Sequence, residues 1–209
     1  WGIPLEGGAI RALFVGPMYT LQEADELGKR IELEYETAAV LDSEHLGPEK
    51  FVETLRTRVD ESYDVIVVGN VDLSILPEDV VGSLLRRVDG GTGLVLARFG
   101  GNVPEAMASF LDAINPEDAA DIVRGIGEKL TPEWESGLEF VSAGTHGNGR
   151  VVELDYGEGR PFCHFLLPRM SKPLEARESF LDVYYSLIAK AVRWAAGRDD
   201  AIWVHSVVD

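Results

Sequence analysis

Two glycine turns enclose a short apolar run at residues 90–102 (GGTGLVLARFGGN), and this feature most constrains how the chain can fold. The run at 94–97 predicts a buried strand, and Pro104 soon after the second turn is typical of the start of a helix. In a parallel α/β sheet, the turn after a central strand lies at the carboxyl edge, where ligands and catalytic groups gather. The turn at 98–102 contains Arg, Phe, two Gly and Asn, none of which is a common nucleophile.

The first half of the chain alternates between short apolar runs and helical periodicity. The apolar runs predict strands at 10–15, 35–41, 63–68 and 94–97. Apolar residues that recur every three or four positions predict helices at 20–31, 48–59, 77–88 and 104–114. Strands separated by helices imply right-handed crossovers. The sequence therefore predicts an α/β fold whose mainly parallel sheet is covered by helices on both faces.

The second half departs from this alternation. We expect residues 115–137 to form an insertion over a sheet edge, with a short helix at 116–126. The last two sheet strands are predicted at 138–141 and 149–156, with a turn at 144–148 between them. The longest helix is predicted at 178–196, ended by Gly197 as a glycine directly after the helix.

These patterns divide the chain into three parts. Residues 1–8 are interpreted as a linker, residues 9–198 as one domain, and residues 199–209 as a tail or the start of a further strand or module. The apolar run at 201–208 is the strand candidate in that tail.

The composition excludes several classes of partner. A formal net charge of −17 disfavours nucleic acid and anionic membranes, because both are bound through clustered Lys and Arg. No run of eighteen apolar residues is present, so no transmembrane helix is predicted. The acidic surface is interpreted as a solubilising one, with an acid-lined cation site as the alternative. The single cysteine, Cys163, excludes an internal disulfide and leaves the redox compartment open. The location is not determined by the sequence, and a cytoplasmic one is the favoured expectation.

Four stretches of the chain resemble the class I glutamine amidotransferase-like superfamily, above all its trehalose-utilisation (ThuA-like) and putative-amidotransferase branches. They are IRALFVGP, YDVIVVGNVD, LPEDVVGSLLRRVDGGTGLVLARFGG, and GNGRVVELDYGEG together with AVRWAAG. The resemblance spans roughly residues 9–198. It implies a flavodoxin-like three-layer αβα sandwich.

The chain departs from that family at the catalytic positions. The family's nucleophilic Cys would fall in the turn after the central strand, where this chain has Phe99, with Arg98 or Gly100 as other alignments. The family's His after a late strand is also missing, since Gly157 follows that strand here. Without a thiolate and an imidazole, no glutamyl thioester can form, so we expect no glutaminase activity. A crevice with glycine N–H groups at a helix start remains, and it suits an anion or a sugar hydroxyl.

Residues at the carboxyl ends of the predicted strands are the candidates for ligand binding. They are Met18, Tyr19, Asn70, Asp72, Arg98, Phe99, Gly100, Gly101, Asn102, His146, Asp155 and Tyr156.

Several of these residues have a simpler interpretation. Asn70 and Asp72 can cap a turn, and His146 can be a solvent-exposed turn residue. Asp155 can pair with Arg98 or contact a ligand. Cys163 is interpreted as a buried packing residue, with a Cys163–His164 dyad as the alternative, although adjacent strand residues point to opposite faces.

The sequence favours a non-catalytic domain of a larger protein that binds a sugar-like small molecule or serves in assembly, and the ThuA-like resemblance implies a role in carbohydrate metabolism. The alternative is a hydrolase or isomerase that uses Asp155, Asp72 or His146 as acid or base. A third hypothesis is an oligomerisation module with an apolar patch over 178–196 or 201–208. Neither a metal nor a nicotinamide cofactor is expected, because the chain lacks His-x-x-x-His and Cys-x-x-Cys spacings and the dinucleotide fingerprint.

Overall fold

The computed structural model describes residues 8–17, 20–40, 48–69, 71–98, 103–117, 119–123, 140–157, 166 and 177–198. These residues build one seven-stranded sheet in the order β2-β1-β3-β4-β7-β6-β5. Its parallel strands are β1 (Ile10–Pro17), β2 (Leu33–Val40), β3 (Val65–Gly69), β4 (Gly93–Arg98) and β7 (Gly149–Asp155). The antiparallel strands β6 (Val141–His146) and β5 (Asn115–Glu117) extend it beyond β7.

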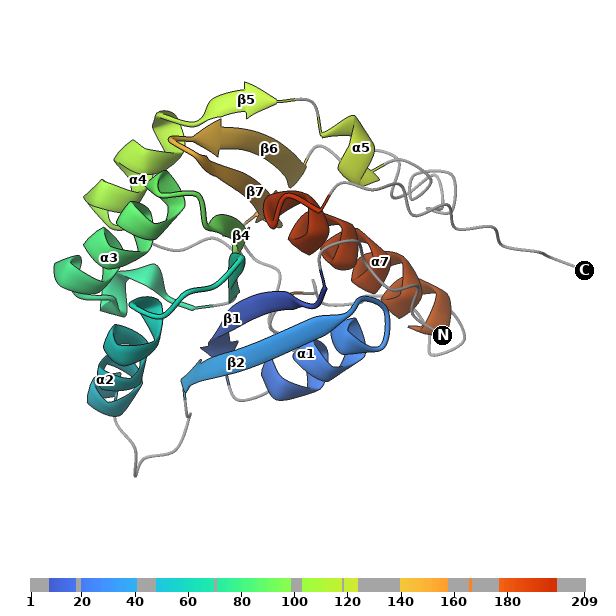
Figure 1. Cartoon of the computed structure of the whole chain (residues 1–209), viewed down its shortest axis with the longest axis horizontal. Coiled ribbons are helices and arrows are strands. Elements are labelled where there is room, and N and C mark those ends of the chain that lie inside the picture. The colour runs from blue at the N-terminus through green and yellow to red at the C-terminus, as the bar shows by residue number, and fades with distance from the viewer. Residues whose placement is uncertain are drawn as a thin grey trace, which may run out of the picture.

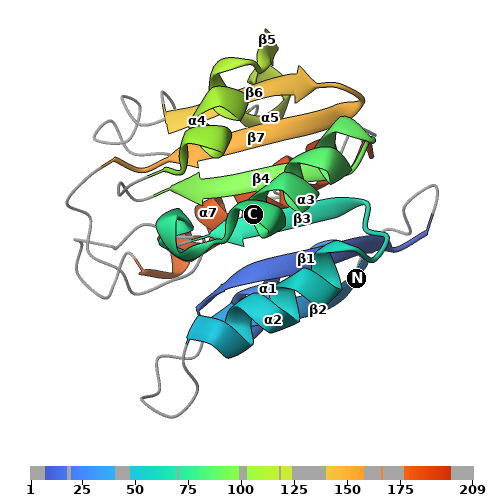
Figure 2. The same ribbon diagram turned by 90° about the vertical axis from the view of Figure 1, so that its left-hand side faces the viewer.

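Helices cover both faces of the sheet, so the molecule has three layers (Figures 1 and 2). The helices α1 (Thr20–Gly28), α5 (Ala120–Val123) and α7 (Arg177–Ala195) share one hydrophobic core with one face of the sheet. The helices α2 (Pro48–Val59), α3 (Glu78–Asp89) and α4 (Glu105–Asp112) share a second core with the other face. The short 3-10 helix η1 (Leu73–Ile75) joins β3 to α3. The α/β class and the mainly parallel sheet are thus as predicted, and the layers match a flavodoxin-like sandwich.

Strand alternation explains how one chain fills two cores. In β4, Leu94 and Leu96 face α2, α3 and α4, whereas Val95 and Ala97 face α7 and α1. All four side chains are at most 3% exposed. A strand that is buried on both faces needs a continuous apolar run, and that run is the sequence signal that predicted this strand.

Apart from the one predicted at 116–126, the predicted helices match the observed ones closely, and the end of α7 is as predicted. Gly197 adopts a φ of +70°, its N–H donates to the carbonyl of Trp194, and the N–H of Arg198 donates to the carbonyl of Arg193. This pair of bonds is the Schellman motif, which ends a helix and favours glycine at the left-handed position. The predicted strand at 201–208 lies outside the described residues.

Two predictions in the second half were wrong. Residues 115–117 form the edge strand β5 rather than the start of a helix, and the helix α5 that follows has four residues. The penultimate strand is at 141–146 instead of 138–141, so Thr145 and His146 lie in β6 and only Gly147 and Asn148 form the turn.

Glycine at position 144 explains both errors. A Cβ there would lie 2.3 Å from Cγ2 of Ile114 and 2.5 Å from the carbonyl oxygen of Asn115. Gly144 therefore marks a place where β5 approaches β6 closely, although the sequence pattern indicated a turn.

None of the helices in the described ranges is long and apolar enough to cross a membrane.

Candidate functional site

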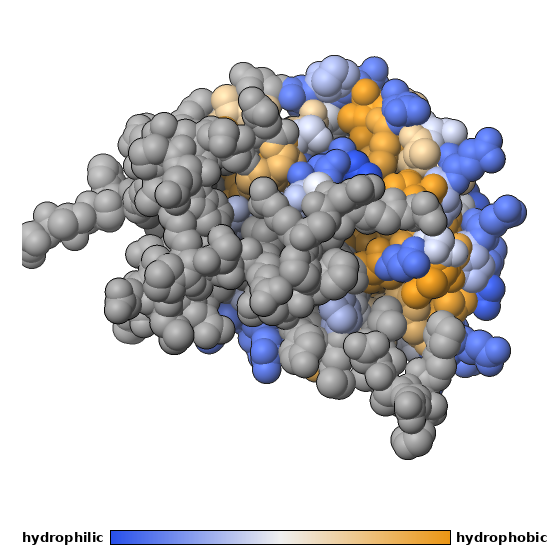
Figure 3. Space-filling view, turned by 180° about the vertical axis from the view of Figure 1, so that it is seen from behind, coloured by the Kyte–Doolittle hydropathy of each residue, from blue (hydrophilic) through white to orange (hydrophobic). Residues whose placement is uncertain are grey.

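The five parallel strands end at one edge of the sheet, the carboxyl edge. Among the candidate residues that the structure describes, Asp72, Arg98, Asp155 and Tyr156 lie at or shortly after the ends of these strands. The neighbouring strands β4 and β7 end level with each other, because Arg98 is the register partner of Asp155. Figure 3 shows this side of the molecule, where the described residues present hydrophobic surface next to hydrophilic surface.

Arg98 is the centre of a polar cluster at this edge. Its Nε donates to Oε1 of Glu153 at 2.5 Å, and its Nη2 donates to Oδ2 of Asp155 at 2.8 Å. The hydroxyl of Ser142 lies 3.4 Å from Oε2 of Glu153. The side chains of Arg98 and Glu153 are 23% and 18% exposed, whereas that of Asp155 is 44% exposed. Among the three charged side chains, Asp155 is thus the one that solvent, or a ligand, reaches most easily.

The period of two residues in a strand brings these side chains together. Arg98 follows Leu94 and Leu96 on the face of β4 that α2, α3 and α4 cover. Glu153 and Asp155 follow Val151 on the same face of β7. Arg98 therefore forms an ion pair with Asp155, one of the two possibilities that the sequence left open. Glu153 was missed, although its spacing of two from Asp155 would have placed it on the same face.

Asp155 and Tyr156 separate to opposite faces of the sheet. Oδ1 of Asp155 accepts the N–H of Gly157 at 3.0 Å, which fixes the carboxylate at the strand end. Tyr156 is only 3% exposed, and its ring lies 5.0 Å from that of Phe140 and 6.2 Å from that of Tyr184. Tyr156 is therefore a core residue beneath the edge and not a lining residue of the Arg98 cluster.

Tyr156 and Glu23 together hold the backbone of Leu166. The hydroxyl of Tyr156 donates to the carbonyl of Leu166 at 3.0 Å, and Oε2 of Glu23 accepts the N–H of Leu166 at 2.8 Å. Glu23 is 2% exposed and Leu166 is fully buried. Burial, together with the charges of Glu23 and Glu26, raises the pKa of Tyr185 nearby. The spacing of four between Glu23 and the buried Leu27 places Glu23 on the apolar face of α1.

Asp72 follows β3 at the carboxyl edge and serves as a cap. Its Oδ1 accepts the N–H of Ser74 at 3.0 Å and the hydroxyl of the same residue at 2.5 Å, at the start of η1. The side chain is exposed. This geometry agrees with the interpretation of Asp72 as a turn cap, and the carboxylate faces solvent.

His146 lies at the opposite end of the parallel strands, beside the start of β7. Because β6 runs antiparallel, His146 pairs with Gly149 at the beginning of β7, whereas Arg98 lies beside the end of β7. The imidazole is partly buried against the ring of Phe110, with centroids 4.5 Å apart. The prediction that His146 belongs with the carboxyl-edge residues is therefore wrong, since the reversed strand direction carries it away from them.

The other predicted site residues lie outside the described residues. They are Met18, Tyr19, Asn70, Phe99, Gly100, Gly101 and Asn102, and the same holds for Cys163 and His164.

The described part of the carboxyl edge is a hydrogen-bonding surface with a net negative charge. One guanidinium and two carboxylates give the Arg98 cluster a net charge of −1. An ionised carboxylate offers about four acceptor sites, so Glu153 and Asp155 retain acceptors for further donors. No group of three or more His, Cys, Asp or Glu side chains that could hold a metal ion occurs within the described part of the chain.

Comparison with known proteins adds no family to this description. The chain matches no protein-family model, and a search of curated proteins finds no match.

Proposed function

We propose that this chain is a non-catalytic, ligand-binding domain of the glutamine amidotransferase-like kind, with its site at the carboxyl edge of the sheet. The observation that carries the proposal is Arg98, which ends the central strand β4 bound to Glu153 and Asp155. The position directly before the family's nucleophile turn thus carries an ion-paired cluster.

The cluster favours one kind of ligand over others. Donors of Arg98 are directed at the two carboxylates, so an incoming anion would compete with both and meet a net charge of −1. Hydroxyl groups can instead donate to the remaining lone pairs of Asp155 and Glu153. The geometry therefore supports a neutral, hydroxyl-rich small molecule such as a sugar, in keeping with a role in carbohydrate metabolism.

The enzymatic alternative draws less support from the same geometry. It requires Asp155, Asp72 or His146 to converge as acid and base, yet His146 lies at the opposite edge and Asp72 is exposed and caps η1. Asp72 also follows β3, which lies two positions from β7 in the sheet, so the ends of these two strands are about 10 Å apart. General acid and base groups must both reach one bound substrate.

The oligomerisation hypothesis lacks its expected patch on the described part of α7. The large hydrophobic side chains that are exposed within the described residues are Leu21 on α1 and Ile75 on η1. Neither belongs to α7.

Two assays test the proposal. Purified protein incubated with glutamine should release no ammonia above the buffer level, and turnover that disappears in Cys163→Ser would contradict the non-catalytic assignment. Calorimetry should detect neutral mono- and disaccharides more readily than sugar phosphates. Glu153→Gln should weaken that binding by about 5-fold or more, since it removes a charged acceptor. Glu117→Gln, at the far edge of the sheet, is the matched control and should leave binding unchanged.

A further inference from the structure

The outer edge of β2 is an open edge of the sheet. β2 is paired with β1 over all eight of its residues, from Ile10↔Leu33 to Pro17↔Val40. No backbone hydrogen bond joins the other side of β2 to any part of the chain that the structure describes. Figure 1 shows β2 as the last strand on this side of the sheet. Alternate N–H and C=O groups of such a strand point outward and can pair with another extended segment.

The opposite edge of the sheet is protected. β5 has only three residues, and the central one is Pro116, which has no N–H to donate. Short edge strands and proline are two of the devices by which proteins prevent pairing at an edge. β2 has neither device, since it is long and contains no proline.

The charges along β2 are all negative. Glu32 directly precedes the strand, and Glu34 and Glu36 follow at intervals of two, so the three share one side of the strand. Glu32 and Glu34 are exposed and form no ion pair with the described residues. The strand has no Lys or Arg, and lysine is the charge most often used to block an edge.

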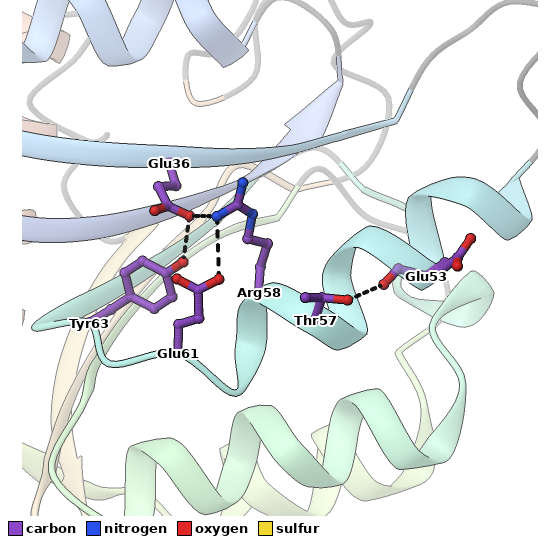
Figure 4. A network of polar contacts seen from close by, with 6 residues as sticks. All are labelled: Glu36, Glu53, Thr57, Arg58, Glu61 and Tyr63. Atoms are coloured by element: carbon purple, nitrogen blue, oxygen red, sulfur yellow. Dashed lines mark hydrogen bonds and ion pairs between the residues drawn. The ribbon is translucent and has the colours of Figure 1, made fainter.

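A polar network holds this side of β2 against α2. Figure 4 shows Glu36 of β2 meeting Arg58 and Tyr63, with Glu61 close to the same guanidinium. The hydroxyl of Tyr63 lies 3.0 Å from Oε2 of Glu36, and Nη1 of Arg58 lies 3.3 Å from Oε1 of Glu61. Arg58 thus faces two carboxylates and cannot offset Glu32 and Glu34 as well. The outer edge therefore carries Glu32 and Glu34 beside its open backbone groups, and the nearest cation on β1 is Arg11, the register partner of Glu34, whose guanidinium lies over the ring of Tyr63.

We propose that the outer edge of β2 docks an extended segment of a protein partner with Lys or Arg at alternate positions, as an added strand. The backbone groups supply hydrogen bonds that any extended segment can make, and the glutamates select a basic one. A second copy of this chain is disfavoured as the occupant, because it would bring acidic strands together in molecules that each carry a net charge of −17.

The test uses the full chain and a synthetic octapeptide in which Lys and Val alternate. Amide resonances are recorded during titration, together with hydrogen exchange in the complex. We expect shifts in β2 and new protection at alternate β2 amides. Glu32→Lys combined with Glu34→Lys should weaken binding by about 10-fold or more, as expected for two lost surface ion pairs of about 0.7 kcal/mol each.

Two controls separate strand addition from charge attraction alone. The variant Asp112→Lys with Glu117→Lys reverses two exposed acids near the opposite edge and should change the affinity by less than about twofold. A peptide with four Lys followed by four Val has the same charge but the wrong spacing and should bind more weakly. Equal binding of both peptides, shifts outside β2, or a dimer through β2 that Glu34→Lys disrupts would each overturn the proposal.

Discussion

At the scale of single residues, the site depends on which side chains a strand places on the same face. The sequence offered Arg98 and Asp155 as candidates because both lie at the carboxyl ends of predicted strands. Glu153, which accepts the Nε–H of Arg98, was missed because it lies inside the strand predicted at 149–156 and not at its end. His146 was misplaced because a sequence does not show that one strand of a hairpin runs against the others.

Removing the guanidinium of Arg98 should destabilise the fold. Arg98→Met leaves the half-buried Glu153 without its charged donor, and we expect the free energy of unfolding to fall by about 1–3 kcal/mol at neutral pH. Urea denaturation measures this change. Lys29→Met is the matched control, because the pair of Lys29 with Glu26 is exposed and should contribute less than about 1 kcal/mol. Equal losses in the two variants would show that the Arg98 cluster is only a surface ion pair.

Tyr63 should make the fold sensitive to alkali. Burial, and then its hydrogen bond to Glu36, raise the pKa of Tyr63 to about 12, from 10.0 in the unfolded chain. Between these two pH values the unfolded chain has lost the proton and the folded chain has kept it. The stabilisation from the neutral phenol is thus fully present below pH 10 and is lost as the pH rises through 12.

The phenylalanine variant tests this origin directly. Tyr63→Phe has no proton to lose, so its free energy of unfolding should fall less steeply than that of the natural sequence between pH 10 and pH 11.5. Urea titrations at several pH values give both slopes. Parallel slopes would mean that other groups cause the alkaline loss.

At the scale of elements, the strands buried on both faces were the easiest to predict. β3 and β4 contain continuous apolar runs, β1 is interrupted only by the exposed Arg11, and each strand was found within two residues of its observed limits. β5 could not be found in this way, since its three residues are exposed and contain proline, which is typical of a loop. β5 can pair with β6 because Gly144 of β6 lets the chain at Ile114 and Asn115 approach closely. This is a tertiary contact, and a local sequence pattern does not predict it.

The docking of α7 on β4 depends on the absence of a side chain at position 93. A Cβ on Gly93 would lie 2.3 Å from the carbonyl oxygen of Ala195 and 2.5 Å from its carbonyl carbon. Gly93→Ala should therefore lower the free energy of unfolding by about 2–4 kcal/mol, because backbone rather than a flexible side chain must move.

Gly28→Ala is the control for that substitution. No heavy atom lies within 4 Å of a Cβ at position 28, which is the last residue of α1. Alanine there should change the stability by less than about 1 kcal/mol, or increase it. Thermal and urea unfolding of the two variants measure the contrast. A Gly93→Ala protein as stable as Gly28→Ala would show that α7 is free to shift on the sheet.

At the scale of the whole molecule, the alternation of strands and helices predicted the class of fold, the parallel sheet and its cover on both faces. It could not predict the final strand order, in which β7 joins β4 and the hairpin partner β6 lies outside it. That order places Arg98 beside Asp155 and Glu153, and so decides what the carboxyl edge presents. The two sheet edges differ as well, with β5 protected and β2 open.

The central proposal is that the carboxyl edge of the sheet, at Arg98, Glu153 and Asp155, binds a hydroxyl-rich molecule and does not transform it. Amide spectra of the labelled protein, recorded over hours with a neutral sugar that binds, test both parts in one sample. We predict shifted resonances at Arg98 and at residues 153–157, with the sugar signals unchanged throughout. Shifts confined to other regions, or sugar signals replaced by those of a product, would contradict the account.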